Sequence, residues 1–179
     1  MPRKCNFDGE CASLPAQRYR RRVPPTFDSY VWVTYGDRAS VLSRFIDRYV
    51  NPERPGDPRF DAFIRVYVTE LPAPGDLESL AELRRDDQAV EGFSIYLCAR
   101  EYWGAIITVT EEGALVLGLS LDDPLNSPQT VEQASTLMRS LIMEFHAEAG
   151  VGGVELPPPQ SATEWRDEGL VVLREGTLS

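Results

Sequence analysis

The feature that most constrains the fold is the order of patterns between residues 105 and 145. Two strand-like runs, residues 105–110 and 114–121, flank the short segment Glu111-Glu112-Gly113. This is typical of a β-hairpin, because glycine can adopt the positive φ that a short loop requires. Apolar residues then follow at helical spacing, namely Val131, Ala134, Leu137, Met138, Leu141, Ile142 and Phe145. A hairpin packed against an amphipathic helix indicates the α+β class.

Similar patterns continue on both sides of this segment. Strands are expected at residues 30–35, 62–69 and 93–99, with an edge strand at 170–173. A second long helix should follow Asp37, which suits an N-cap, and end before Asn51-Pro52. A short helix is expected to begin at Asp76.

The ends of the helix after residue 127 are less sharply defined. Thr130 and Gln133 have the spacing of a capping box, whereas Ser127 before Pro128 is a competing start. Gly150 is the expected residue after the helix C-terminus. The whole pattern predicts one α+β domain over residues 30–179, with a mostly antiparallel or mixed sheet of five to six strands. Two long amphipathic helices and one short helix should cover one face of this sheet.

Residues 1–29 have no sustained apolar period and are expected to form an irregular or mobile arm. The arm contains a compact basic and aromatic patch made of Arg18, Tyr19, Arg20, Arg21 and Arg22. Such a patch could bind phosphates or fold back on an acidic body.

Charge is distributed unevenly along the 179 residues, whose formal net charge is −10. Residues 1–30 carry a net +3, and residues 31–179 carry a net −13. An acidic surface repels nucleic acids and membranes and attracts basic proteins, although such charge can also serve solubility alone. We therefore expect a basic protein partner, and neither a nucleic acid nor a membrane.

The expected location is the cytoplasm. No run of 18 or more apolar residues is present, and the basic residues near Met1 are not followed by the apolar stretch of a secretory signal. Three cysteines, Cys5, Cys11 and Cys98, form an odd set that suits a reducing compartment.

Residue types that carry catalysis or bind metals are scarce. His146 is the one histidine, and we expect it near a helix C-terminus, where the helix dipole favours a cation. The spacing of Cys5 and Cys11 is too long for a zinc knuckle, and no phosphate-binding glycine loop or nucleophile elbow is present. We expect no catalytic residues, no metal and no cofactor. The acidic pairs, Asp86-Asp87, Glu111-Glu112 and Asp122-Asp123, leave a carboxylate-based hydrolase, with or without a metal, as an alternative.

The best candidates for partner binding lie around the connection between two predicted strands. Tyr102 and Trp103 place two large aromatic side chains where a connection is normally small and polar. Aromatic residues of this kind anchor protein interfaces, although Trp103 could instead begin the next strand and pack inward. The acidic candidates are Glu101, Glu111, Glu112, Asp122 and Asp123.

The segment from Trp103 to Phe145 reads WGAIITVTEEGALVLGLSLDD, then a turn, then the helix TVEQASTLMRSLIMEF. It resembles the C-terminal half of some small immunity proteins of bacterial polymorphic-toxin systems, with an aromatic-glycine entry, a hairpin and a final amphipathic helix. The resemblance implies a small acidic cytosolic domain that binds and blocks one toxin, and it supplies no binding residues. The leading hypothesis is a non-enzymatic immunity-type inhibitor of a basic protein. The hydrolase and a self-associating structural component are the alternatives.

Overall fold

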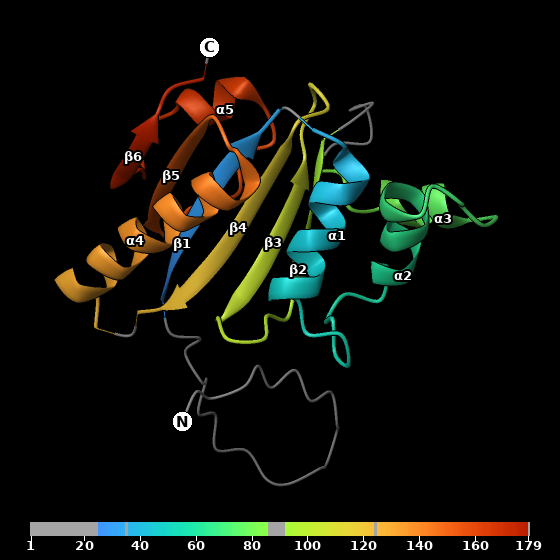
Figure 1. The fold of residues 1–179 in the computed structure, drawn as a ribbon, viewed down its shortest axis with the longest axis horizontal. Helices are drawn as coiled ribbons and strands as arrows, with labels where there is room; N and C mark the ends of the chain where they lie inside the picture. Colours follow the sequence, from blue (N-terminus) through green and yellow to red (C-terminus); the bar gives the residue numbers. More distant parts are fainter. Residues whose placement is uncertain (1–24, 35, 86–91, 124, 179) are drawn as a thin grey trace, which may run out of the picture.

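The computed structural model of the protein describes residues 25–34, 36–85, 92–123 and 125–178. One antiparallel sheet runs in the order β2-β3-β4-β1-β5-β6 (Figure 1). Its strands are β1 (Thr26–Val33), β2 (Phe93–Leu97), β3 (Gly104–Val109), β4 (Leu115–Asp122), β5 (Ala149–Val154) and β6 (Leu173–Gly176). The helices are α1 (Arg38–Tyr49), α2 (Phe60–Phe63), the π-helix η1 (Ile64–Val68), α3 (Asp76–Ala81), α4 (Pro128–Phe145) and α5 (Ala162–Arg166). The predicted α+β class, the hairpin at Glu111-Glu112-Gly113 and the two long helices are confirmed.

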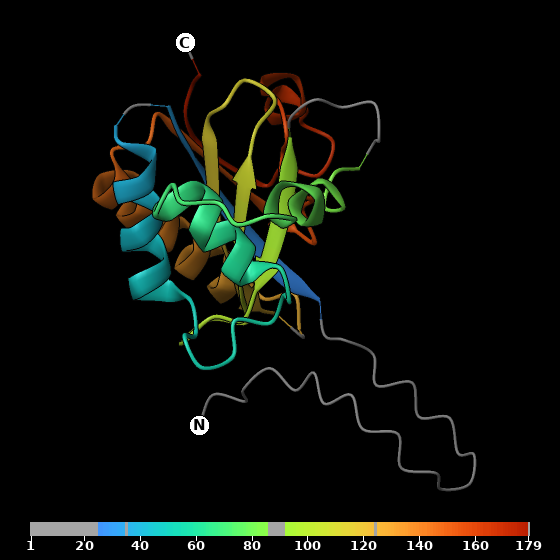
Figure 2. The ribbon, with the colours of Figure 1, turned by 90° about the vertical axis from the view of Figure 1, so that its right-hand side faces the viewer.

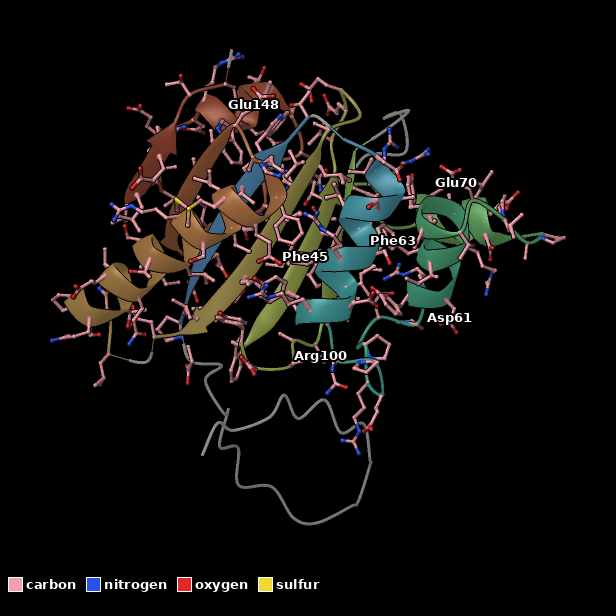
Figure 3. The ribbon with its side chains drawn as sticks, viewed as in Figure 1. Phe45, Asp61, Phe63, Glu70, Arg100 and Glu148 are labelled. Carbon is pink, nitrogen blue, oxygen red and sulfur yellow. The ribbon has the colours of Figure 1, made fainter. Side chains whose placement is uncertain are left out.

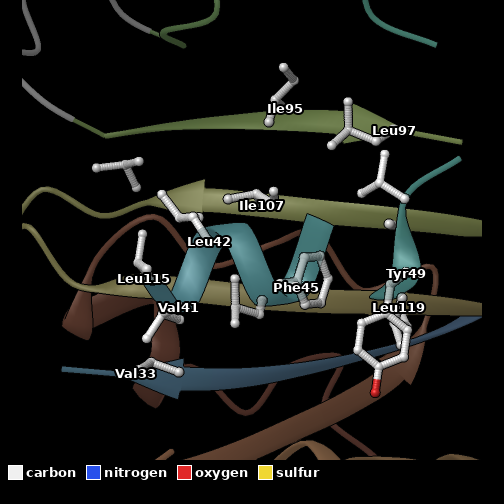
Figure 4. Packing of buried hydrophobic residues seen from close by; sticks show 14 of the residues in the cluster. Val33, Val41, Leu42, Phe45, Tyr49, Ile95, Leu97, Ile107, Leu115 and Leu119 are labelled. Carbon is white, nitrogen blue, oxygen red and sulfur yellow. The ribbon is translucent and has the colours of Figure 1, made fainter. Parts of the chain in front are cut away.

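One face of the sheet is covered by α1, α2, α3 and α4, and the short α5 lies on the opposite side (Figure 2). The apolar stripe of α1 points at the strands, where Leu42 and Phe45 are fully buried beside Ile107 and Leu119 (Figure 4). Burial of each such side chain contributes about 1.5–3 kcal/mol. This face therefore carries the larger core.

The second face carries a smaller core built on aromatic side chains. The rings of Trp32 and Trp165 meet edge to face at 5.3 Å, and the hydroxyl of Tyr30 donates to the carbonyl of Leu156 at 2.7 Å. Trp165 belongs to α5, which the sequence did not predict. That helix contributes one large apolar residue to the core, so no helical period marks it.

The strand predicted at residues 62–69 is wrong, because this segment forms α2 and η1. The amide of Thr69 donates to the carbonyl of Ile64 at 2.9 Å, the spacing of a π-helix. Phe63 and Tyr67 stack at 5.1 Å, and both rings contact Phe93. A short apolar run cannot distinguish a strand from a packed helix, and here contact with α1 and β2 favours the helix.

One boundary differs from that expected, and of the two possible starts of α4 the structure has Ser127. The first strand begins at Thr26, which pairs with Asp122, so residues 26–29 belong to the sheet and not to the arm. Residues 1–24 lie outside the described part of the chain. Ser127 is the N-cap of α4, since its hydroxyl accepts a bond from the amide of Thr130 and Pro128 follows it.

The C-terminal end of α4 was placed too late in the chain. The helix ends at Phe145, because His146 adopts the left-handed conformation with φ of 51°. Gly150 instead lies inside β5, a glycine-rich strand that the sequence did not predict. A Cβ on Gly150 would lie 2.5 Å from Cγ of Met138 on α4. The missing side chain therefore lets α4 approach the sheet closely.

This contact predicts that Gly150→Ala lowers the free energy of unfolding by about 1–3 kcal/mol, as overpacking of a dense core does. The loss should shrink in a Met138→Ala background, because the two side chains share the same space. Urea unfolding of the single and double variants measures both values. Gly169→Ala, at an exposed position, is the control and should change stability by less than about 0.5 kcal/mol. Equal effects at the two glycines would contradict this account of β5.

The carboxylate of Asp76 predicts a local response to acid. It accepts bonds from Nε and Nη2 of Arg65, at 2.8 and 2.7 Å, and from the amide of Ala73 at 2.7 Å. The hydrogen bonds from Arg65, and then the one from Ala73, lower the pKa of Asp76 from 3.8 to about 2. A lowered pKa in the folded state stabilises the fold above pH 3.8, and that stabilisation is lost as the pH falls toward 2. In the Asp76→Asn variant, the melting temperature should therefore fall less steeply between pH 3.8 and pH 2 than in wild type, as measured by thermal unfolding. Glu78→Gln on the same helix is the control and should leave this pH dependence unchanged.

Candidate functional site

A groove of about 890 Å³ opens at the end of the sheet where β4 ends and α4 begins. This is the lower end of the sheet in Figure 1, below α1 and beside the loop between β2 and β3. The groove is lined by Arg48 and Tyr49 of α1, by Glu101 and Tyr102 of the loop, by Leu121 of β4, and by Gln129, Glu132, Gln133, Thr136, Leu137 and Ser140 of α4. It brings predicted site residues together with new ones.

The lining of the groove combines apolar and aromatic side chains with polar ones. Leu137 is buried, Leu121 is half-buried, and the rings of Tyr49 and Tyr102 lie 6.0 Å apart. Desolvation by burial raises the pKa of both tyrosine hydroxyls. Both tyrosines therefore stay protonated and can donate hydrogen bonds at neutral pH.

One wall of the groove is held by a polar link between α1 and α4. The hydroxyl of Tyr49 donates to Oε2 of Glu144 at 2.7 Å, and Nη1 of Arg48 donates to Oε1 of the same residue at 3.1 Å. Nη2 of Arg44 donates to the backbone carbonyl of Glu144 at 2.7 Å. The side chain of Glu144 is only 21% exposed, so this carboxylate is fixed in place.

The rim of the groove is richer in carboxylates than in cations. Glu101 and Glu132 are exposed at its edge, and Asp122 is exposed at the adjacent end of β4. Among the described residues, the cations at this end include Arg48, which is paired with Glu144, and Arg100, which lies in the loop below α1 (Figure 3). The free carboxylates make this end of the sheet attractive to a cation.

Four of the predicted site residues lie at this end of the sheet, namely Glu101, Tyr102, Trp103 and Asp122. Trp103 is half-buried, and its amide donates to the carbonyl of Ser120 at 2.9 Å. It therefore begins the pairing of β3 with β4 and is neither a fully exposed anchor nor a fully buried core residue.

Asp123, one of the acidic candidates, is buried. Its side chain is only 2% exposed, and its Oδ1 accepts bonds from the amide of Ser127 and the hydroxyl of Thr130, both at 2.9 Å. Asp123 thus holds the first turn of α4 against the end of β4. Asp123 lies four residues before Ser127 and seven before Thr130. A carboxylate at this place ahead of a helix can be recognised in the sequence, whereas its burial cannot.

Glu111 and Glu112 do not lie beside Tyr102. They form the turn between β3 and β4, at the opposite end of the sheet, separated from the groove by the length of β3. Six strand residues span about 20 Å. Oε1 of Glu112 accepts the amide of Ala162 at 2.8 Å, so this residue supports the start of α5. The predicted site residues therefore fall into two separate groups.

The sequence missed the residues that α1 and α4 contribute. Arg48, Glu132, Gln133 and Thr136 read only as the solvent side of amphipathic helices. Tyr49 was placed in the apolar stripe of α1, which is correct, but its hydroxyl reaches α4. No local signal marks these residues, because the groove exists only where the two helices and the loop meet.

Residues with catalytic potential are dispersed in the described part of the chain. Cys98 is half-buried after β2, whereas His146 is exposed after α4. Across residues 25–34, 36–85, 92–123 and 125–178, no three His, Cys, Asp or Glu side chains gather closely enough to hold a metal ion. Cys5, Cys11 and Asp86-Asp87 lie outside these ranges. No described helix combines the length and the apolar character that a membrane crossing requires.

Comparison with known proteins gives one similar structure. No protein-family model and no curated protein matches the sequence. Among solved structures, similarity is found to a chain in the crystal structure of the toxic C-terminal tip of CdiA from Pseudomonas aeruginosa in complex with immune protein. The TM-score is 0.45 and the sequence identity 13%, over 87% of this chain and 97% of that chain. This similarity assigns neither a family nor any site residue.

The link between α1 and α4 predicts the effect of Tyr49→Phe. Loss of a hydrogen bond to a carboxylate should lower the free energy of unfolding by about 1–2 kcal/mol, because Glu144 stays partly buried. Urea unfolding measures the change. Tyr96→Phe, at an exposed tyrosine of β2, is the control and should have little effect. No difference between the two variants would contradict the proposed role of Tyr49 in fixing the wall.

Proposed function

We propose that this chain is a non-enzymatic binding protein of the immunity type, which blocks a basic protein by engaging it at the groove. The observation that supports this proposal is a groove in which aromatic and apolar side chains, of which Tyr102 and Leu121 are the more exposed, lie beside a rim that carries Glu101 and Glu132. The resemblance of residues 103–145 to small immunity proteins suggests a bacterial toxin as the basic partner.

The groove suits a long cationic side chain of the partner. The aliphatic stem of an arginine or lysine can pack on Tyr102 and Leu137, while its charged head reaches the carboxylates at the rim. A planar guanidinium can also lie on a tyrosine ring. Exposed carboxylates around such a pocket mainly raise the rate of encounter with a basic partner, and the desolvated aromatic side chains slow its dissociation.

We propose binding without catalysis for a further reason. Catalytic groups often have a shifted pKa because their site is arranged for chemistry. Of the shifted groups considered above, Tyr49 bonds to Glu144 and Asp76 to Arg65, and both bonds join helices. Burial is the main cause of the raised pKa of Tyr49 and Tyr102, and the bonds from Arg65 are the main cause of the lowered pKa of Asp76.

The test uses tagged full-length protein to capture its partner from the native host. Wild-type protein should recover a protein of basic isoelectric point. Glu101→Lys with Glu132→Lys should slow association with that protein by about 10-fold or more at low salt, measured by biolayer interferometry, because two attractive charges become repulsive. The difference should shrink as salt screens the charges.

The matched control is Glu111→Lys with Glu168→Lys, which makes the same change of charge at exposed positions away from the groove. This variant should associate nearly as fast as wild type. Expression of the captured protein should arrest bacterial growth, and co-expression of the present chain should relieve the arrest. An acidic partner, or equal effects of the two double variants, would overturn the proposal.

A further inference from the structure

We propose that the groove is also the docking site of a segment of this chain itself, Arg18 to Arg22, which occupies it when no partner is bound. This inference rests on the proposed function, because it concerns the regulation of the same site. Four observations carry it: the attachment point of the segment, its length, the charge of the groove, and a buried carboxylate oxygen beside the attachment point.

The attachment point lies beside the groove. The carbonyl of Pro25 accepts a bond from the amide of Asp123 at 2.9 Å, and Thr26 pairs with Asp122. Asp123 in turn accepts from Thr130 of α4, one turn before the groove residue Gln133. Pro25, the first described residue, therefore lies at the groove end of the sheet, where β1 begins (Figure 1).

The length of the segment matches the groove. The lining residues of α4 run from Gln129 to Ser140, which corresponds to about 17 Å along a helix. The five residues from Arg18 to Arg22 span at most about 17 Å when extended. Only two residues separate Arg22 from Pro25, so Arg22 is within reach of the mouth of the groove.

The charges are complementary. The segment reads Arg-Tyr-Arg-Arg-Arg and carries four positive charges. The groove end presents Glu101, Asp122 and Glu132 as exposed carboxylates. The segment thus has the same chemistry as the basic partner proposed above, cationic side chains with one aromatic ring.

A buried oxygen gives independent support. Asp123 is almost completely buried, and its Oδ2 accepts no hydrogen bond from any described residue. Buried carboxylate oxygens normally have a donor, because leaving them without one costs free energy. The guanidinium of Arg22, three residues before Pro25, would supply a donor at this place.

Tethering makes even a weak contact effective. A short linker gives an effective concentration on the order of millimolar, so a peptide contact with a Kd of about 100 μM would be occupied roughly ten-elevenths of the time. A partner would then compete with the segment for the groove. Removal of the four charges should expose a site that is otherwise largely filled.

The experiment uses the full chain and a fluorescent peptide of residues 15–25 as the probe. A variant with Arg18, Arg20, Arg21 and Arg22 all changed to Gln should bind this peptide about 10-fold more tightly than wild type, measured by fluorescence anisotropy. In the four-Gln background, Glu101→Lys with Glu132→Lys should abolish binding, whereas Glu111→Lys with Glu168→Lys should not. Amide NMR shifts that differ between wild type and the four-Gln variant should cluster on Leu121, Gln133 and Leu137.

The outcomes separate this inference from the proposed function. Equal affinity of the peptide for wild type and the four-Gln variant, or no binding to either, would overturn self-docking. If partner capture still depends on Glu101 and Glu132 in that case, the proposed function stands. Peptide binding that persists in the variant with Glu101→Lys and Glu132→Lys would also overturn self-docking, since the segment would then bind elsewhere.

Discussion

The groove and the larger core depend on the contact between α1 and α4. Phe45 and Tyr49 of α1 pack against Phe145 of α4, with ring centroids 5.8 and 6.4 Å apart, and Glu144 joins the same helices through its carboxylate. Aromatic pairs of this kind add about 0.5–1.5 kcal/mol beyond the area that they bury. The contact fixes how far apart the helices lie, and so it fixes the width of the groove between α4 and the loop that carries Tyr102.

Close approach of α4 to the sheet completes this arrangement. The glycines of β5 leave space for Met138, so the helix packs closely over β1 and β5. Asp123 then holds the first turn of α4 to the end of β4. The groove thus lies between two links, the bond of Tyr49 to Glu144 and the bond of Thr130 to Asp123. A groove that is already formed lowers the cost of ordering it when a partner binds.

The two ends of the sheet have different structural roles. The end that carries Glu112 is closed by α5 and the second core, and its carboxylates support local structure. The groove end keeps exposed carboxylates beside aromatic rings. At the groove end, exposed carboxylates lie beside a concave surface that contains Tyr102 and Leu121. This distinction supports a binding role there, and it also explains why a basic segment joined at Pro25 would compete with a partner.

The sequence by itself determined the class of fold, the hairpin at Gly113, the stripes of α1 and α4, and the acidic body, because each depends on local spacing or on summed charge. It misassigned residues 62–69, since a short apolar run fits a strand or a packed helix until its neighbours are known. It missed β5 and α5, where glycines and a single tryptophan carry no period. Of the residues that line the groove, Glu101 and Tyr102 were among the sequence candidates, whereas Tyr49 and Glu132 were not. Only the tertiary structure decided that Glu111 and Glu112 lie about one strand length from Tyr102 and that Asp123 is buried. Distances across a sheet and burial under a helix depend on residues far apart in the chain, and no local pattern encodes them.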